Sequence, residues 1–275
     1  MIDETHLTYL DNLIGWAEDA GVYVIITYQA GPGRDEAVFA GAANANLTVW
    51  DSQEAQDAWA EMWRLTAERY GQSAVVAGYD LLTEPTVNRL IDPSGERSPQ
   101  EVAAAAGTTR DWNRFAATPI IVDSMNWASA AWFLALTVFD DPNIVYGLHT
   151  YDPDLYTQQE AGQGAISYPS VVDYAGERVQ FDSAWLRENL EPVRTFQQTH
   201  NVPVFVGEFG TLRWVPGSER YFNGFDVELG ADVDQARQSA AGCLSGCLVA
   251  QYRLSEPLRL TPPRCSGAAC LQSPW

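Results

Sequence analysis

Five apolar runs of strand length, separated by longer polar segments, constrain the fold of this chain more than any other feature. They are VYVIITY at 22–28, AVVAGYDLL at 74–82, PIIVD at 119–123, IVYGLHTY at 144–151 and PVFVGEF at 203–209. Short continuous apolar runs are typical of strands buried on both faces of a sheet. Segments 4–20, 51–70 and 182–200 instead repeat their apolar residues at helical spacing. This alternation predicts an α/β fold built on a parallel sheet.

The helical segments carry start and stop signals. Asp51, with Glu54 three positions later, predicts a capping box at the start of helix 51–70. Gly21 predicts the end of helix 4–20, and 182–200 reads as one helix. Periodicity alone leaves both a closed barrel and an open doubly wound sheet possible. No Gly-rich phosphate loop follows the first run, so the sequence does not support nucleotide binding.

Polar residues of catalytic type follow three of the predicted strands. Glu84 follows the second run, His149 and Tyr151 close the fourth, and Glu208 closes the fifth. In a parallel barrel the carboxyl ends of all strands face one side, so these side chains would meet in one cleft. Two carboxyl groups about 5 Å apart are what a retaining glycosidase needs, one as acid and one as nucleophile. Glu84 and Glu208 fit those two roles.

Three motifs around these residues resemble glycoside hydrolase family 5, the cellulase and mannanase family. GYDLLTEP is similar to its strand-four motif, LHTYDPDLYTQQ to its strand-six His-x-Tyr motif, and VPVFVGEFGTLRW to its strand-seven motif. The resemblance covers roughly residues 5–223 and implies a (β/α)8 TIM barrel. It implies that Glu84 is the acid/base and Glu208 the nucleophile. It also implies that His149 contacts the substrate or the acid/base, and that Tyr151 donates a hydrogen bond to the nucleophile.

Four further residues are candidates for substrate contact. Thr83 stands where the family places an Asn that binds the sugar 2-hydroxyl, and Gln29 stands where the family usually has a His. Trp127 follows the third run and Trp214 follows Glu208, so each is a candidate platform for a sugar ring.

The legible strands correspond to strands three to seven of the eight in such a barrel. We therefore expect an incomplete barrel from a truncated or frame-shifted gene, with a partial catalytic domain over 1–223 and an atypical tail of uncertain fold over 224–275. The tail holds all four cysteines, Cys243, Cys247, Cys265 and Cys270. Their spacing is compatible with metal ligands or disulfides, and we favour incidental thiols.

Charge and composition exclude several partners. The net charge is -20 and every basic residue is Arg, which argues against nucleic acid and against an anionic membrane. No metal motif is present, because the three His lie at 6, 149 and 200 on different elements, and we expect no cofactor. The first residues lack the pattern of a secretory signal. The sequence indicates neither the compartment nor the oligomeric state.

The predicted function is retaining hydrolysis of a β-linked polysaccharide such as β-1,4-glucan or mannan. Two alternatives stay open: a non-catalytic, carbohydrate-binding degenerate barrel, and an unstable gene fragment. Sugar binding without turnover would indicate the first alternative, and aggregation on expression would indicate the second.

Overall fold

The computed structural model describes residues 4–39, 45–86, 118–161, 165–222 and 252–253. Its contacts divide the chain into two units. Unit 1 comprises Met1–Ala128 and Ala135–Tyr146, and unit 2 comprises Ser129–Leu134 and Gly147–Trp275. Strand β4 (Ile144–Thr150) begins in unit 1 and ends in unit 2. The four cysteines, and the predicted tail 224–275 except Tyr252–Arg253, lie outside the described residues.

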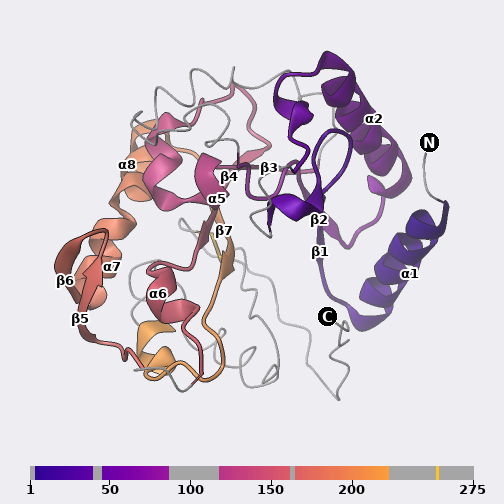
Figure 1. The fold of residues 1–275 in the computed structure, drawn as a ribbon. Helices are drawn as coiled ribbons and strands as arrows, with labels where there is room; N and C mark the ends of the chain where they lie inside the picture. The colour runs from indigo at the N-terminus through magenta and orange to yellow at the C-terminus, as the bar shows by residue number, and fades with distance from the viewer. Residues whose placement is uncertain (1–3, 40–44, 87–117, 162–164, 223–251, 254–275) are drawn as a thin grey trace. The chain divides into compact units, whose positions relative to one another are not determined.

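Unit 1 is built on parallel strands, with a long helix between the first two (Figure 1). Its elements are α1 (Glu4–Ala20), β1 (Val24–Thr27), η1 (Glu36–Val38), η2 (Thr48–Trp50), α2 (Gln53–Tyr70), β2 (Val76–Asp80), β3 (Ile120–Asp123) and α5 (Met125–Ala128). Strand β1 pairs in parallel with β2, and β2 pairs in parallel with β3. The parallel pairing confirms the α/β prediction.

Helix α2 is fixed to the strand that precedes Glu84. Trp59 and Trp63 are each 1% exposed, and their indole N–H groups both donate to the Leu81 carbonyl, at 3.0 and 2.9 Å. The helix starts one residue later than predicted, because Ser52 rather than Asp51 is the N-cap and accepts from the Ala55 amide. The predicted capping box was therefore wrong in its residue, although the predicted helix is confirmed.

Unit 2 contains the end of β4 and a second group of elements. They are η3 (Ala130–Ala135), α6 (Asp154–Thr157), β5 (Ser170–Tyr174), β6 (Glu177–Phe181), α7 (Ser183–Asn189), α8 (Glu191–His200), β7 (Val204–Phe209) and β8 (Tyr252–Arg253). Strand β7 lies between β4 and β8 in the sheet, and β8 pairs with it antiparallel. Strand β8 was not among the strands predicted from the sequence.

Two further features of unit 2 differ from the prediction. The single helix expected over 182–200 is two helices, because Pro192 occupies the first turn of α8 and a proline there begins a new helix rather than continuing the old one. Strands β5 and β6, which the sequence did not predict, form an antiparallel hairpin. Its loop, Ala175 and Gly176, has φ angles of 51° and 83°, as a two-residue turn of this kind requires.

None of the described helices is both long enough and apolar enough to span a bilayer.

Candidate active site

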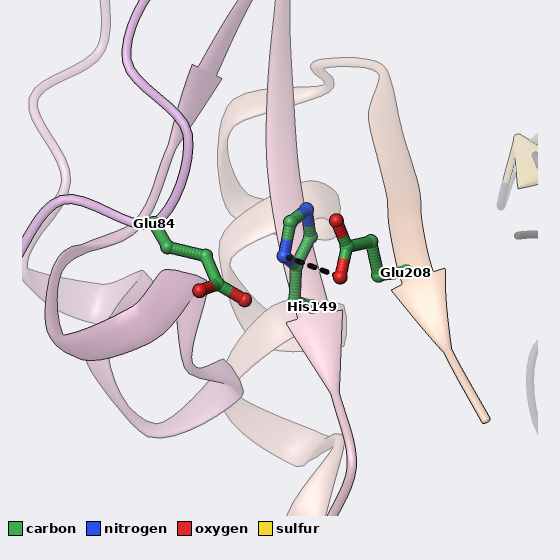
Figure 2. Close-up of side chains that lie close together, drawn as sticks. All are labelled: Glu84, His149 and Glu208. Carbon is green, nitrogen blue, oxygen red and sulfur yellow. Dashed lines mark ion pairs between the residues drawn. The ribbon is translucent and has the colours of Figure 1, made fainter. Parts of the chain in front are cut away.

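Three of the predicted site residues meet in unit 2. The Tyr151 hydroxyl donates to Oε2 of Glu208 at 2.8 Å, and Nδ1 of His149 lies 3.6 Å from the same oxygen (Figure 2). His149 and Glu208 lie within β4 and β7 rather than after them, whereas Tyr151 follows β4. His149 is buried and Glu208 is half-buried. The Tyr151 hydroxyl thus orients one carboxylate oxygen, and the His149 ring lies beside the same oxygen.

The residue before Glu208 must be small. A Cβ atom built on Gly207 would lie 2.7 Å from Nε2 and 3.0 Å from Cδ2 of His149. Real Cβ atoms do not approach other atoms so closely, so the buried imidazole would have to move. Gly207 therefore allows His149 to pack against the backbone of β7.

We expect Gly207→Ala to lower the free energy of unfolding by about 1–3 kcal/mol, the usual cost of overpacking. Denaturant unfolding followed by circular dichroism measures this change. Gly15→Ala is the control, because nothing lies within 4 Å of its Cβ position in helix α1. That substitution should be neutral or slightly stabilising. Equal unfolding midpoints for the two variants would contradict the predicted clash.

Glu84 lies in unit 1, in the turn that follows β2. Its φ angle is 50°, in the left-handed region that residues other than glycine rarely adopt. Hydrogen bonds hold its backbone on both sides. Its amide donates to Oδ2 of Asp123 at 3.2 Å, and its carbonyl accepts from Nη2 of Arg34 at 2.8 Å and from the Thr86 hydroxyl at 2.6 Å. The strained conformation is therefore imposed by its surroundings.

Thr83 belongs to a partly buried polar cluster beside Glu84. It is 2% exposed, and its hydroxyl donates to Oδ2 of Asp80 at 3.1 Å. The Thr27 hydroxyl donates to the same oxygen at 3.0 Å and also contacts the Thr83 hydroxyl. The predicted sugar contact of Thr83 stays a prediction.

Arg34 is a residue of this region that the sequence did not suggest. It is 1% exposed, and its Nη1 donates to the Gln29 carbonyl at 2.9 Å. Burial lowers the pKa of Arg34 to about 10, although the carboxylates of Glu84, Asp80 and Asp123 favour the charged form. The guanidinium therefore stays charged at neutral pH. The side chain of Gln29 itself is exposed.

The two candidate tryptophan platforms are partly exposed. Trp127 is 37% exposed, and its ring meets the Phe39 ring edge-on at 5.7 Å. It belongs to three consecutive residues with left-handed φ angles between 53° and 65°. Trp214 is 45% exposed, and its indole N–H donates to the Gln159 carbonyl at 2.8 Å.

Asp152, next to Tyr151, connects the unpredicted β5–β6 hairpin to the site through hydrogen bonds. Its carboxylate accepts from the Tyr174 hydroxyl at 3.2 Å and from the Asn189 amide at 3.1 Å, and its carbonyl accepts from the Tyr221 hydroxyl at 2.8 Å. Desolvation and the adjacent Asp152 carboxylate raise the pKa of Tyr174 to about 12, so its hydroxyl remains a donor at neutral pH. Only the Asp-Pro pair after the His-x-Tyr motif could have drawn attention to this residue.

The predicted site residues thus fall into two groups. Unit 2 brings His149, Tyr151 and Glu208 together, and in unit 1 Arg34 links the backbones of Gln29 and Glu84. Among the described residues, neither unit by itself brings together three His, Cys, Asp or Glu side chains that could bind one metal ion. We assign no metal.

Several solved structures are similar to this fold. The Thermotoga maritima endoglucanase Cel5A, solved with cellobiose, aligns with a TM-score of 0.59 at 18% identity over 84% of this chain and 68% of that chain. A Clostridioides difficile cellulose synthase subunit Z aligns with a TM-score of 0.54 at 19% identity over 84% of this chain and 70% of that chain. These similarities support the predicted barrel class.

Sequence relatives agree with the fold. Endoglucanase C of Acetivibrio thermocellus is 22% identical over 234 residues, which are 76% of this chain and 64% of that protein. A probable glucan 1,3-beta-glucosidase A of Neosartorya fischeri is 35% identical over 92 residues, which are 33% of this chain and 22% of that protein. The chain thus spans less than two thirds of the length of the endoglucanase.

The family model described as cellulase (glycosyl hydrolase family 5) matches residues 1–223, which include every predicted site residue. The chain belongs to glycoside hydrolase family 5.

Proposed function

We propose that the protein hydrolyses a β-linked polysaccharide with retention of configuration, with Glu208 as nucleophile and Glu84 as acid/base. The observation that carries this proposal is the pair of contacts to Glu208. The Tyr151 hydroxyl donates to one oxygen of the Glu208 carboxylate, and Nδ1 of His149 lies near the same oxygen. These contacts support a carboxylate that is held in one orientation for attack on the sugar. An acid whose only role was solubility would not need two such partners.

The proposed reaction has two steps. A Glu208 oxygen attacks the anomeric carbon while Glu84 gives its proton to the leaving glycosidic oxygen, so the C–O bond breaks and a glycosyl-enzyme ester forms. Glu84, now a carboxylate, takes a proton from water, which attacks the anomeric carbon and releases Glu208. Such chemistry requires the two carboxyl groups about 5 Å apart. The barrel fold of the family provides this by gathering strand ends on one side.

We propose β-1,4-glucan or mannan as the substrate class. Relatives named as endoglucanases favour glucan. The strongly negative charge and the absence of Lys suit a neutral polymer. Trp127 and Trp214 have exposed ring surface available to stack on sugar rings.

A non-catalytic sugar-binding protein is the second candidate, and Thr83 favours it. The family places an Asn at this position, whereas the Thr83 hydroxyl is buried and bonded to Asp80. A sugar hydroxyl would then lose one hydrogen bond that strengthens in the transition state.

The test measures reducing-sugar release from carboxymethylcellulose, barley β-glucan and mannan, with the anomeric configuration of the first product followed by NMR. Release with retention supports the proposal, and the preferred polymer identifies the substrate. Release with inversion would rule out Glu208 as nucleophile. A folded protein that binds these polymers without releasing sugar would establish the second candidate.

Tyr151→Phe should lower kcat by about tenfold to a hundredfold with little change in KM. It removes one hydrogen bond to a charged group, which contributes about 1.5–3 kcal/mol. Steady-state kinetics on the preferred polymer measure the effect. Tyr9→Phe is the matched control, because Tyr9 is 68% exposed on α1. An unchanged kcat in Tyr151→Phe would show that this contact does not assist the nucleophile.

A further inference from the structure

Arg34 connects several parts of unit 1 through one buried guanidinium. Nη1 donates to the Gln29 carbonyl at 2.9 Å, and Nη2 donates to the Glu84 carbonyl at 2.8 Å. The group also lies 5.0 Å from the centre of the Phe39 ring, which in turn meets Trp127 edge-on. One side chain thus contacts the loop after β1, the turn after β2 and the support of a candidate sugar platform.

The loop that carries Arg34 is built to hold it in place. Gly31 and Arg34 exchange two backbone hydrogen bonds of 3.0 Å, and Gly33 between them has a φ angle of 75°. A Cβ atom on Gly31 would lie 2.6 Å from the Trp59 ring, so the loop packs directly on helix α2. The loop therefore places the backbone of Arg34 at a defined point, from which its guanidinium reaches the carbonyls of Gln29 and Glu84.

The contact with Glu84 falls where the backbone is strained. Glu84 adopts φ 50°, and its carbonyl would be free to rotate if its partners were lost. Arg34 and Thr86 donate to that carbonyl, and only Arg34 brings a charge. Burial disfavours that charge, whereas the carboxylates of Glu84, Asp80 and Asp123 favour it, and the guanidinium stays charged beside the turn.

We infer that Arg34 is a positioning residue for the acid/base, which aims the Glu84 carboxyl group at the leaving oxygen by fixing its backbone. This inference rests on the proposed function. It predicts that kcat/KM, which reports the first step, falls only on substrates whose leaving group needs a proton. The kcat/KM for a substrate whose leaving group departs without a proton, such as dinitrophenolate, should not depend on Arg34. The kcat/KM for a substrate that releases phenol should depend on Arg34.

The experiment compares Arg34→Lys and Arg34→Met with wild type on phenyl and dinitrophenyl β-cellobioside. The value of kcat/KM reports the steps through glycosyl-enzyme formation. Lys retains the charge but cannot donate in the forked geometry that joins Gln29 and Glu84. We expect kcat/KM on the phenyl substrate to fall about tenfold to a hundredfold in Arg34→Met and less in Arg34→Lys. On the dinitrophenyl substrate it should change less than about threefold in both. Arg64→Met is the control, because Arg64 is an exposed residue of α2 that pairs with Glu61 and Glu68.

The outcomes separate the two proposals. If wild type cleaves both glycosides and kcat/KM of the Arg34 variants falls equally on both, or falls on neither, the positioning role is overturned while the proposed function stands. If neither Arg34 variant gives a folded protein by circular dichroism, Arg34 serves the fold and the positioning role is also overturned. If wild type cleaves neither glycoside and releases no sugar from the polymers, the proposed function itself falls.

Discussion

Glu208→Gln is expected to lower kcat/KM on the preferred polymer by on the order of 10⁴- to 10⁶-fold, the range seen when one member of a covalent catalytic set is removed. Gln has nearly the same shape but cannot attack as an anion. It can still accept the hydrogen bond from Tyr151, so the fold around β7 should be preserved. Reducing-sugar release over hours, against a substrate blank, gives the residual rate.

The control for this variant is Glu188→Gln, which neutralises an exposed carboxylate of α7 and should leave the rate unchanged. A direct test of the covalent step uses a fluorinated β-cellobioside that forms the glycosyl-enzyme but hydrolyses slowly. Peptide mass spectrometry should find the sugar on the peptide that contains Glu208. Labelling of another residue, or an active Glu208→Gln, would exclude Glu208 as the nucleophile.

Glu84→Ala is expected to lower kcat/KM on phenyl β-cellobioside by about 10²- to 10⁴-fold, the usual contribution of general acid catalysis. On dinitrophenyl β-cellobioside the same variant should keep most of its kcat/KM, because this leaving group needs no proton. Its kcat should nevertheless fall, since in the proposed mechanism Glu84 also activates the water of the second step. Added azide should restore kcat by replacing that water, with a glycosyl azide as product.

The matched control is Glu36→Ala, an exposed acid of η1 in the same unit. Equal losses on the two glycosides in Glu84→Ala would mean that the residue has a structural role. Rescue by azide together with a normal first step would assign Glu84 to both halves of the reaction.

Five strands of this fold were predictable from the sequence, whereas strands β5, β6 and β8 were not. Each of the five apolar runs contains the strand expected of it. Burial on both faces was expected of all five, but only one of the four residues of β1 is buried. The break at Pro192 was readable in principle, since proline lacks the amide that an uninterrupted helix would use. The β5–β6 hairpin was missed because its exposed strands lack a strong apolar pattern and its turn signal is a single Ala-Gly pair.

The candidate site also contains residues that the sequence indicated and features that it did not. Glu84, His149, Tyr151 and Glu208 stand in motifs of the family, so their residue types and spacing indicated them. Arg34 donates to the backbone carbonyls of Gln29 and Glu84. Every residue has a backbone carbonyl, so the sequence does not show which of them a side chain will contact. The φ angle of Glu84 was equally invisible, because nothing in Thr-Glu-Pro predicts a left-handed conformation.

The hydrogen bonds to the Leu81 carbonyl affect the choice of site through which this protein can be attached to a solid support. Its two lone pairs are both occupied, by the indoles of Trp59 and Trp63, three residues before Glu84. The inner face of α2 is therefore hydrogen-bonded to the segment that leads to the turn carrying Glu84. The outer face, which carries exposed Arg64 and its ion-pair partners, has no such connection among the described contacts. Attachment through side chains of that outer face would leave both hydrogen bonds to the Leu81 carbonyl in place.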